Sequence, residues 1–107
     1  MFFGIRACIN EQQEEVRAIN SAHNSYVAAF DESVQRADIY KIPALENALF
    51  CLQKIKELEN NSKFHGSNVY SSKRSMLIQK TQSIYEEANR KHYYATLEEL
   101  KQIKAKI

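Results

Sequence analysis

Residues that interrupt helices are scarce in this chain of 107 residues, where Gly4, Pro43 and Gly66 are the only glycines and proline. A sandwich or barrel of short strands needs a turn about every 8–12 residues. A glycine-rich phosphate-binding loop cannot be built from two glycines so far apart. The long stretches between these three residues favour helices. We therefore expect an all-α fold.

The stretch before Pro43 carries a helical pattern, because seven of its residues recur at spacings of three and four and so share one face of a helix. These residues are Val16, Ile19, His23, Tyr26, Phe30, Val34 and Ala37. Asn10 is a suitable N-cap, and the acidic residues that follow it suit a helix N-terminus. The pattern predicts a first helix over about residues 10–39.

Three further helices are expected after this one. Pro43 ends the first helix and suits the first turn of a second, over about 43–60. This helix is apolar around more than half its circumference, which is typical of a central helix. A loop over 61–68 precedes a third helix over about 69–94, and Thr96 with Glu99 forms a capping box that predicts a short fourth helix over 96–106. We expect a single domain over 1–107, an antiparallel bundle of three long helices and a short one.

Residues 1–9 are expected to form an apolar N-terminal arm, whose conformation (strand, helix or coil) the sequence leaves open. Burying a large apolar side chain contributes about 1.5–3 kcal/mol, so the arm should dock on its own bundle or on a second copy. The face of the first helix favours a second copy, and we expect a homodimer. The self-association candidates are Phe2, Phe3, Ile5, Ile9, Val16, Ile19, His23, Tyr26 and Phe30.

The sequence shows no arrangement typical of an active site or a metal centre. His23, His65 and His92 lack a partner at the spacing that stacks two ligands on one helical face, and we expect His23 in the interior or at a subunit interface. Cys51 lies in the most apolar stretch, where burial keeps a thiol protonated, whereas the reactivity of Cys8 stays open. We predict that the protein is not an enzyme and has no cofactor or metal.

The N-terminal segment does not resemble a cleaved signal peptide, because no basic stretch precedes its apolar residues and Arg6 interrupts it. No run of eighteen apolar residues exists, so no membrane span is expected. Two cysteines are too few for a disulfide scaffold. We expect a cytoplasmic protein, with export that needs no N-terminal signal as the alternative.

Charge is unevenly distributed along the chain. Residues 1–53 carry four Lys or Arg against seven Asp or Glu, and residues 54–107 carry eleven against six. This basic second half either balances an acidic neighbouring helix or binds an acidic partner. With its tyrosines it also suggests an alternative function, nucleic-acid binding. The basic residues for that alternative are Lys63, Lys73, Arg74, Lys80, Arg90 and Lys91.

Two short motifs resemble those of known exported proteins. Phe64-His65-Gly66 in the loop, with Tyr94 four residues before Glu98, resembles the turn and export motifs of the small secreted helical hairpins of type VII systems. That family has a tryptophan where Phe64 stands, and Pro43 here breaks the first arm. The glutamates near the C-terminus resemble the tail of some bacterial effectors exported by type IV systems. These resemblances imply a further alternative, a small exported bacterial effector, without assigning the chain to either family.

Aromatic residues near the expected helix ends point to protein binding, because tyrosine supplies a large contact area and is enriched at interfaces. We predict a non-catalytic protein-binding module, such as an adaptor, an inhibitor or an immunity-type protein. The partner-binding candidates are Tyr40, Phe64, Tyr70, Lys73, Arg74, Tyr93 and Tyr94.

Overall fold

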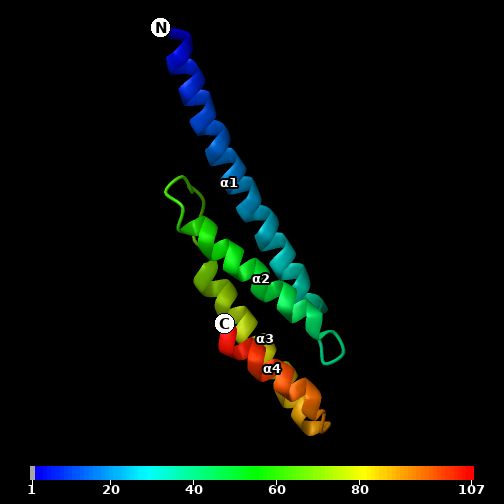
Figure 1. Ribbon diagram of the computed structural model, residues 1–107. Coiled ribbons are helices and arrows are strands. Elements are labelled where there is room, and N and C mark those ends of the chain that lie inside the picture. The colour runs from blue at the N-terminus through cyan, green and yellow to red at the C-terminus, as the bar shows by residue number, and fades with distance from the viewer. Residues whose placement is uncertain (1) are drawn as a thin grey trace.

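Four helices make up most of the chain in the computed structural model, which describes the backbone of residues 2–107 and the side chains of residues 13–107. The helices are α1 (Phe2–Arg36), α2 (Ile42–Glu59), α3 (Tyr70–Arg90) and α4 (Tyr94–Lys106), shown in Figure 1. Residues 2–107 contain no strand. The all-α prediction is confirmed, and the contacts between the helices fit a bundle.

α1 is longer at its start than the sequence pattern predicts. The helix expected to begin at Asn10 begins at Phe2, so the segment over residues 1–9, whose conformation the sequence leaves open, is helical from Phe2 onward and continuous with the first helix. A single glycine inside a helix costs only about 0.5–1 kcal/mol, and Gly4 does not end this one. α1 ends at Arg36, three residues before the predicted end, because Asp38 accepts a hydrogen bond from the Tyr40 backbone N–H at 2.8 Å and closes a turn.

α2 is the central helix of the bundle and contacts α1, α3 and α4. Pro43 lies in its first turn, as predicted, where the missing N–H of proline costs no helical hydrogen bond. Its buried residues surround much of the helix, and they are Ile42, Leu45, Ala48, Leu49, Cys51, Leu52 and Ile55. A helix with such an apolar circumference needs neighbours on more than one side.

The turn between α3 and α4 is built around His92. The Tyr93 N–H donates to the Ala88 carbonyl at 3.0 Å, and the His92 N–H donates to the Asn89 carbonyl at 3.2 Å. With His92 at φ 59°, this is a Schellman motif that ends α3 at Arg90. α4 therefore begins at Tyr94, two residues before Thr96, and the predicted capping box is wrong because no side chain caps this helix.

The described part of the molecule is elongated, with principal extents of 70 × 18 × 18 Å. α1 accounts for much of this length, since its first turns run past the end of α2 and the loop that follows it (Figure 1). The core lies along α2, where Phe30 of α1, Leu77 of α3 and Leu100 of α4 are almost fully buried. Among the described residues, no helix combines the length and apolarity needed to cross a bilayer.

Candidate partner-binding surface

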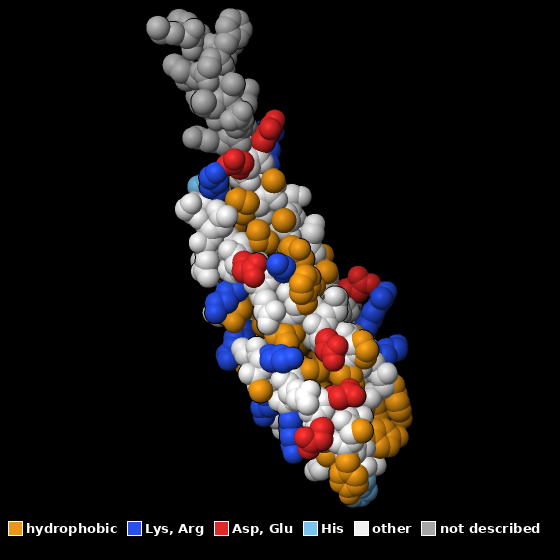
Figure 2. Space-filling view, viewed as in Figure 1, with side chains coloured by type: hydrophobic (Ala, Val, Ile, Leu, Met, Phe, Trp, Pro, Cys, Tyr) orange, Lys and Arg blue, Asp and Glu red, His pale blue; other side chains and the backbone are white. Residues whose placement is uncertain are grey.

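Three of the predicted partner-binding residues gather at one end of the molecule. Tyr40 lies in the turn between α1 and α2, whereas Tyr93 and Tyr94 lie where the second turn leads into α4. The ring centroids of Tyr40 and Tyr93 are 6.3 Å apart. Tyr40 is 71% exposed, Tyr94 69% and Tyr93 38%, and Figure 2 shows hydrophobic side chains and a histidine at this lower end. We call these three residues the tyrosine end.

The backbone beneath the tyrosine end is well anchored. Ala37 and Ile39 are buried beside Tyr40, so the first turn is held against the core. The Schellman motif fixes the second turn, and the ring of His92 lies 6.1 Å from that of Tyr94. The exposed rings therefore stand on two fixed turns rather than on a mobile loop.

One cation stands beside these rings. The Nζ atom of Lys91 is 5.7 Å from the centroid of the Tyr40 ring, a favourable cation–π arrangement. Charge attraction to the Tyr40 oxygen raises the pKa of Lys91, and hydrogen bonding with Tyr40 raises the pKa of Tyr93. Near neutral pH this end therefore presents the positive ammonium group of Lys91 and the neutral phenol of Tyr93.

A second group of contacts joins three helices around a buried carboxylate. His23 of α1 is 4% exposed, and its Nε2 atom donates to Oε2 of Glu59 at 2.7 Å. Glu59 is the last residue of α2, and it also accepts the backbone N–H groups of Val69 (3.0 Å) and Tyr70 (3.2 Å) at the start of α3. His23 is thus an interior histidine with a hydrogen-bond partner, one of the two positions predicted for it.

The loop between α2 and α3 is held against α1 by packing, a hydrogen bond and an ion pair. The ring of Phe64 packs against His23 with centroids 4.5 Å apart, and Asn20 accepts a hydrogen bond from the His65 backbone N–H at 3.3 Å. Lys63 forms an ion pair with Glu15. Phe64, predicted as a partner-binding residue, is therefore half-buried in an internal contact far from the tyrosine end.

The basic residues of the second half lie largely in contacts within the chain. Lys73 pairs with Asp31 of α1 at 2.7 Å, and Arg74 donates from Nε to the Ile107 carbonyl at 3.2 Å. Lys63 also pairs with α1, and Lys91 lies 3.4 Å from Glu87. These contacts favour the interpretation that the basic segment balances an acidic neighbouring helix.

The remaining candidates are spread over the molecule. Tyr70 is half-buried, with Nζ of Lys56 5.5 Å from its ring centroid. Phe30 and His23 are both buried within this chain. In this conformation, therefore, neither residue can contact a second copy. Val16, Ile19 and Tyr26 are half-buried along α1. Phe2, Phe3, Ile5 and Ile9 lie outside the residues whose side chains are described.

Glu59 is the residue that the sequence analysis missed. A signal for its role is the residue at the start of α3: the N-cap position is Val69, and valine has no side-chain oxygen to accept a hydrogen bond. The free backbone N–H groups at this helix start therefore need an acceptor from another part of the chain. Glu59 is also the last acidic residue before a stretch of residues 60–85 that contains none.

Two findings about the described residues bear on metal binding and on nucleophilic chemistry. Residues 13–107 contain no cluster of three His, Cys, Asp or Glu side chains that could hold a metal ion. Burial raises the pKa of the Cys51 thiol, which makes it a poor nucleophile. The chain matches no protein-family model, no curated protein and no solved structure.

Proposed function

We propose that this chain is a non-catalytic protein-binding module, of the adaptor, inhibitor or immunity type, that contacts its partner through the tyrosine end. The observation that carries the proposal is the grouping of Tyr40, Tyr93 and Tyr94 as exposed rings on two fixed turns. Tyrosine is enriched in the residues that dominate binding energy at interfaces. Because the backbone beneath the rings is anchored, little conformational entropy is lost on binding.

The charge of this end indicates what kind of partner surface fits it. Lys91 is protonated beside the rings and lies 3.4 Å from Glu87, and no acidic residue lies in the segment from Arg90 to Thr96. Because the contact with Glu87 joins two exposed side chains, we propose that a partner surface with an exposed carboxylate among apolar groups competes with Glu87 for Lys91 and covers the rings. Charge complementarity of this kind favours specificity and fast association.

The arrangement of the helices is part of the proposal. An antiparallel bundle of three longer helices and a shorter one brings the α1–α2 turn and the α3–α4 turn to the same end, where Tyr40 meets Tyr93. We propose further that the protein acts as a homodimer, as the apolar N-terminal sequence suggests.

Site-specific photo-crosslinking tests the proposed surface. A photo-reactive phenylalanine analogue placed at Tyr40 or Tyr94 in the full chain should crosslink one partner in the cells that make the protein, and the analogue placed at Met76 on α3 should not. Met76 is a suitable control because it is also a large, exposed apolar residue, 39% exposed. Equal crosslinking from Met76 would contradict the proposal.

Affinity for the crosslinked partner provides the second measurement. Replacing Tyr40 and Tyr94 together by serine should weaken binding by at least about thirtyfold, which corresponds to about 2 kcal/mol, the contribution of a single residue of this class when it dominates an interface. Both side chains are largely exposed, so the helical content and the unfolding midpoint should stay unchanged. An unchanged Kd for this double variant would refute the tyrosine end as the binding surface.

The nucleic-acid alternative has less support. Four of its six proposed basic residues contact groups of the same chain, namely Lys63, Lys73, Arg74 and Lys91. A phosphate backbone would have to compete with these contacts, and the affinity would fall steeply with salt. Binding to duplex DNA or RNA that survives 200 mM salt would favour this alternative over protein binding.

A further inference from the structure

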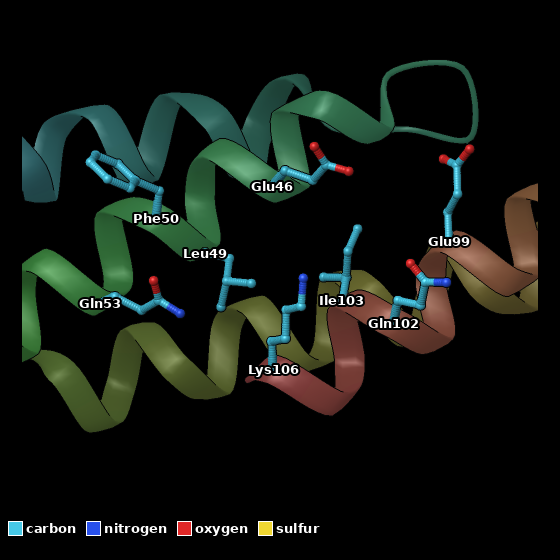
Figure 3. A pocket seen from close by; sticks show the side chains of 8 residues that line it. All are labelled: Glu46, Leu49, Phe50, Gln53, Glu99, Gln102, Ile103 and Lys106. Carbon is cyan, nitrogen blue, oxygen red and sulfur yellow. The ribbon is translucent and has the colours of Figure 1, made fainter.

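A groove lies between α2 and α4, on the surface that leads away from the tyrosine end. It encloses about 410 Å³, and Figure 3 shows its eight lining residues, four from each helix. Leu49 and Ile103 form its apolar floor and are nearly buried. Phe50 lies at its edge and is 49% exposed, and its ring points away from α4 and lies 6.3 Å from the ring of Tyr26 on α1 (Figure 3). The groove therefore offers apolar area on its floor and an exposed aromatic residue at its edge to an occupant.

The charged residues that line the groove differ between its two ends. Along α2 the lining residues run from Glu46 to Gln53, and along α4 they run from Glu99 to Lys106, both in the same direction in Figure 3. The two glutamates lie in the first half of each helix, and the lysine lies at the end of α4. An amphipathic helix seated here is favoured with its positive N-terminal end at the glutamates and an acidic residue at Lys106.

We propose that this groove binds the first turns of α1 from a second copy of the chain, roughly residues 2–14, and that two copies exchange these segments reciprocally. This inference rests on the homodimer in the proposed function and assigns its interface. The segment is rich in large apolar residues, and Arg6 is its only charged residue before Glu11. Its positive charge therefore precedes its negative charges along the helix, which matches a groove with glutamates at one end and Lys106 at the other.

The spacing of the charges agrees with this seating. At 1.5 Å per residue, the eight steps from Arg6 to Glu14 span about 12 Å of helix, and the seven steps from Glu99 to Lys106 span about 10.5 Å. Arg6 can therefore lie near the glutamates while Glu14 lies near Lys106. Glu14 is exposed in the single chain, so its carboxylate can reach a second copy without breaking an internal contact.

The shape of the molecule explains why the occupant comes from another copy. The first turns of α1 continue straight past the end of α2, so in this conformation they lead away from the groove of their own chain (Figure 1). Two copies placed side by side and head to tail about a twofold axis bring each segment beside the groove of the other. In that arrangement the segment also runs parallel to α2 and α4, with its N-terminus toward the glutamates. A twofold interface of this kind buries both grooves at once.

The solution mass of the full chain, measured by light scattering over a concentration series, provides the first test. We expect a dimer whose Kd rises by about thirtyfold or more in Phe50→Glu, because a carboxylate is then buried against apolar groups. Met76→Glu is the matched control, since Met76 is an exposed apolar residue of α3 outside the groove. A wild-type chain that stays monomeric, or an equal effect of both substitutions, would overturn the inference.

Charge reversal tests which segment occupies the groove. Arg6→Glu and Glu99→Arg should each raise the dimer Kd by about tenfold, and the double variant should restore it to within about threefold of wild type. Glu98→Arg is the control, because Glu98 is also exposed on α4 but lies outside the groove. This substitution alone should leave the dimer Kd unchanged, and it should not rescue Arg6→Glu. If the double variant is as weak as the sum of the single variants, residues 2–14 are not the occupant.

The two proposals can fail separately. Loss of the dimer in Phe50→Glu with intact partner crosslinking at Tyr40 would support the groove and leave the tyrosine end as the binding surface. A monomeric wild type that still binds its partner through Tyr40 and Tyr94 would overturn only the exchange of α1 segments.

Discussion

The carboxylate of Glu59 should contribute more to stability than any other single charged group described here, because three helices meet at it. Its side chain is 7% exposed, and its two oxygens accept hydrogen bonds from His23, Val69 and Tyr70. Glu59→Ala removes all three acceptor contacts at once. It leaves one buried imidazole and two backbone N–H groups of α3 without the partner they have in the folded chain.

The size of the effect follows from these contacts. A hydrogen bond to a charged group contributes about 1.5–3 kcal/mol, which is the expected loss at His23. The N–H groups of Val69 and Tyr70 lose an acceptor that serves as the cap of α3, and a lost cap costs about 0.5–2 kcal/mol. Together, Glu59→Ala should lower the free energy of unfolding by about 2–5 kcal/mol, a substantial share of the roughly 5–15 kcal/mol typical of a domain.

Urea unfolding followed by circular dichroism measures this loss. Glu57→Ala is the control, since Glu57 lies two residues before Glu59 on the same helix, is 67% exposed and pairs with Lys54 at 3.4 Å. That substitution should change the free energy of unfolding by less than about 0.5 kcal/mol. The double variant with His23→Ala should lose clearly less than the sum of the two single variants, because both remove the same bond. A loss below about 1 kcal/mol for Glu59→Ala, or strict additivity with His23→Ala, would refute the central role of this carboxylate.

Three further predictions concern single positions. His92→Gly should raise the unfolding midpoint, by up to about 1 kcal/mol in free energy, because φ 59° at this position suits glycine, and His92→Ala should not; a lower midpoint for the glycine variant would contradict the Schellman assignment. Gly66→Ala should cost about 1–2 kcal/mol in urea unfolding, since its Cβ would lie 2.8 Å from Cζ of Phe64; a neutral result would mean that the ring can move freely. In a Cys8→Ser background, Cys51 should react with iodoacetamide only on unfolding, because burial raises its pKa. Rapid alkylation of the folded chain would contradict the burial. Because the folded-state pKa is raised, the contribution of Cys51 to stability is present below the ordinary thiol pKa of about 8.5 and is lost as pH rises above it. Cys51→Ala should therefore reduce the decline of the free energy of unfolding at alkaline pH.

The four helices could be predicted from local sequence signals, and their ends only in part. The spacing of apolar residues and the position of Pro43 are local signals, each read within a few residues of the chain. α1 and α2 can therefore be recognised from the sequence alone. The end of α3 depends on His92 adopting a left-handed conformation, which residues other than glycine adopt rarely. The capping pattern at Thr96 is therefore present in the sequence but lies inside a helix that has already begun.

The sequence predicts which residue types form the candidate site, but it does not predict which of these residues lie together in space. Tyr40 and Tyr93 are 53 positions apart, and only the packing of the two turns brings their rings together. Phe64 looks equivalent in the sequence, yet the bond between His23 and Glu59 creates the internal surface on which its ring packs. Contacts of this kind depend on partners distant in sequence, which periodicity does not report.

The length of α1 has a consequence for how the protein behaves in solution. A compact chain of this size has a radius of gyration of about 13 Å, whereas the described chain has 18.3 Å. A monomer of this shape experiences more friction than a sphere of equal mass, so it elutes early from a sizing column and sediments slowly. Small-angle scattering separates the assemblies that such a column would confuse. Two copies side by side keep a longest dimension near 70 Å, and two copies joined end to end approach twice that length.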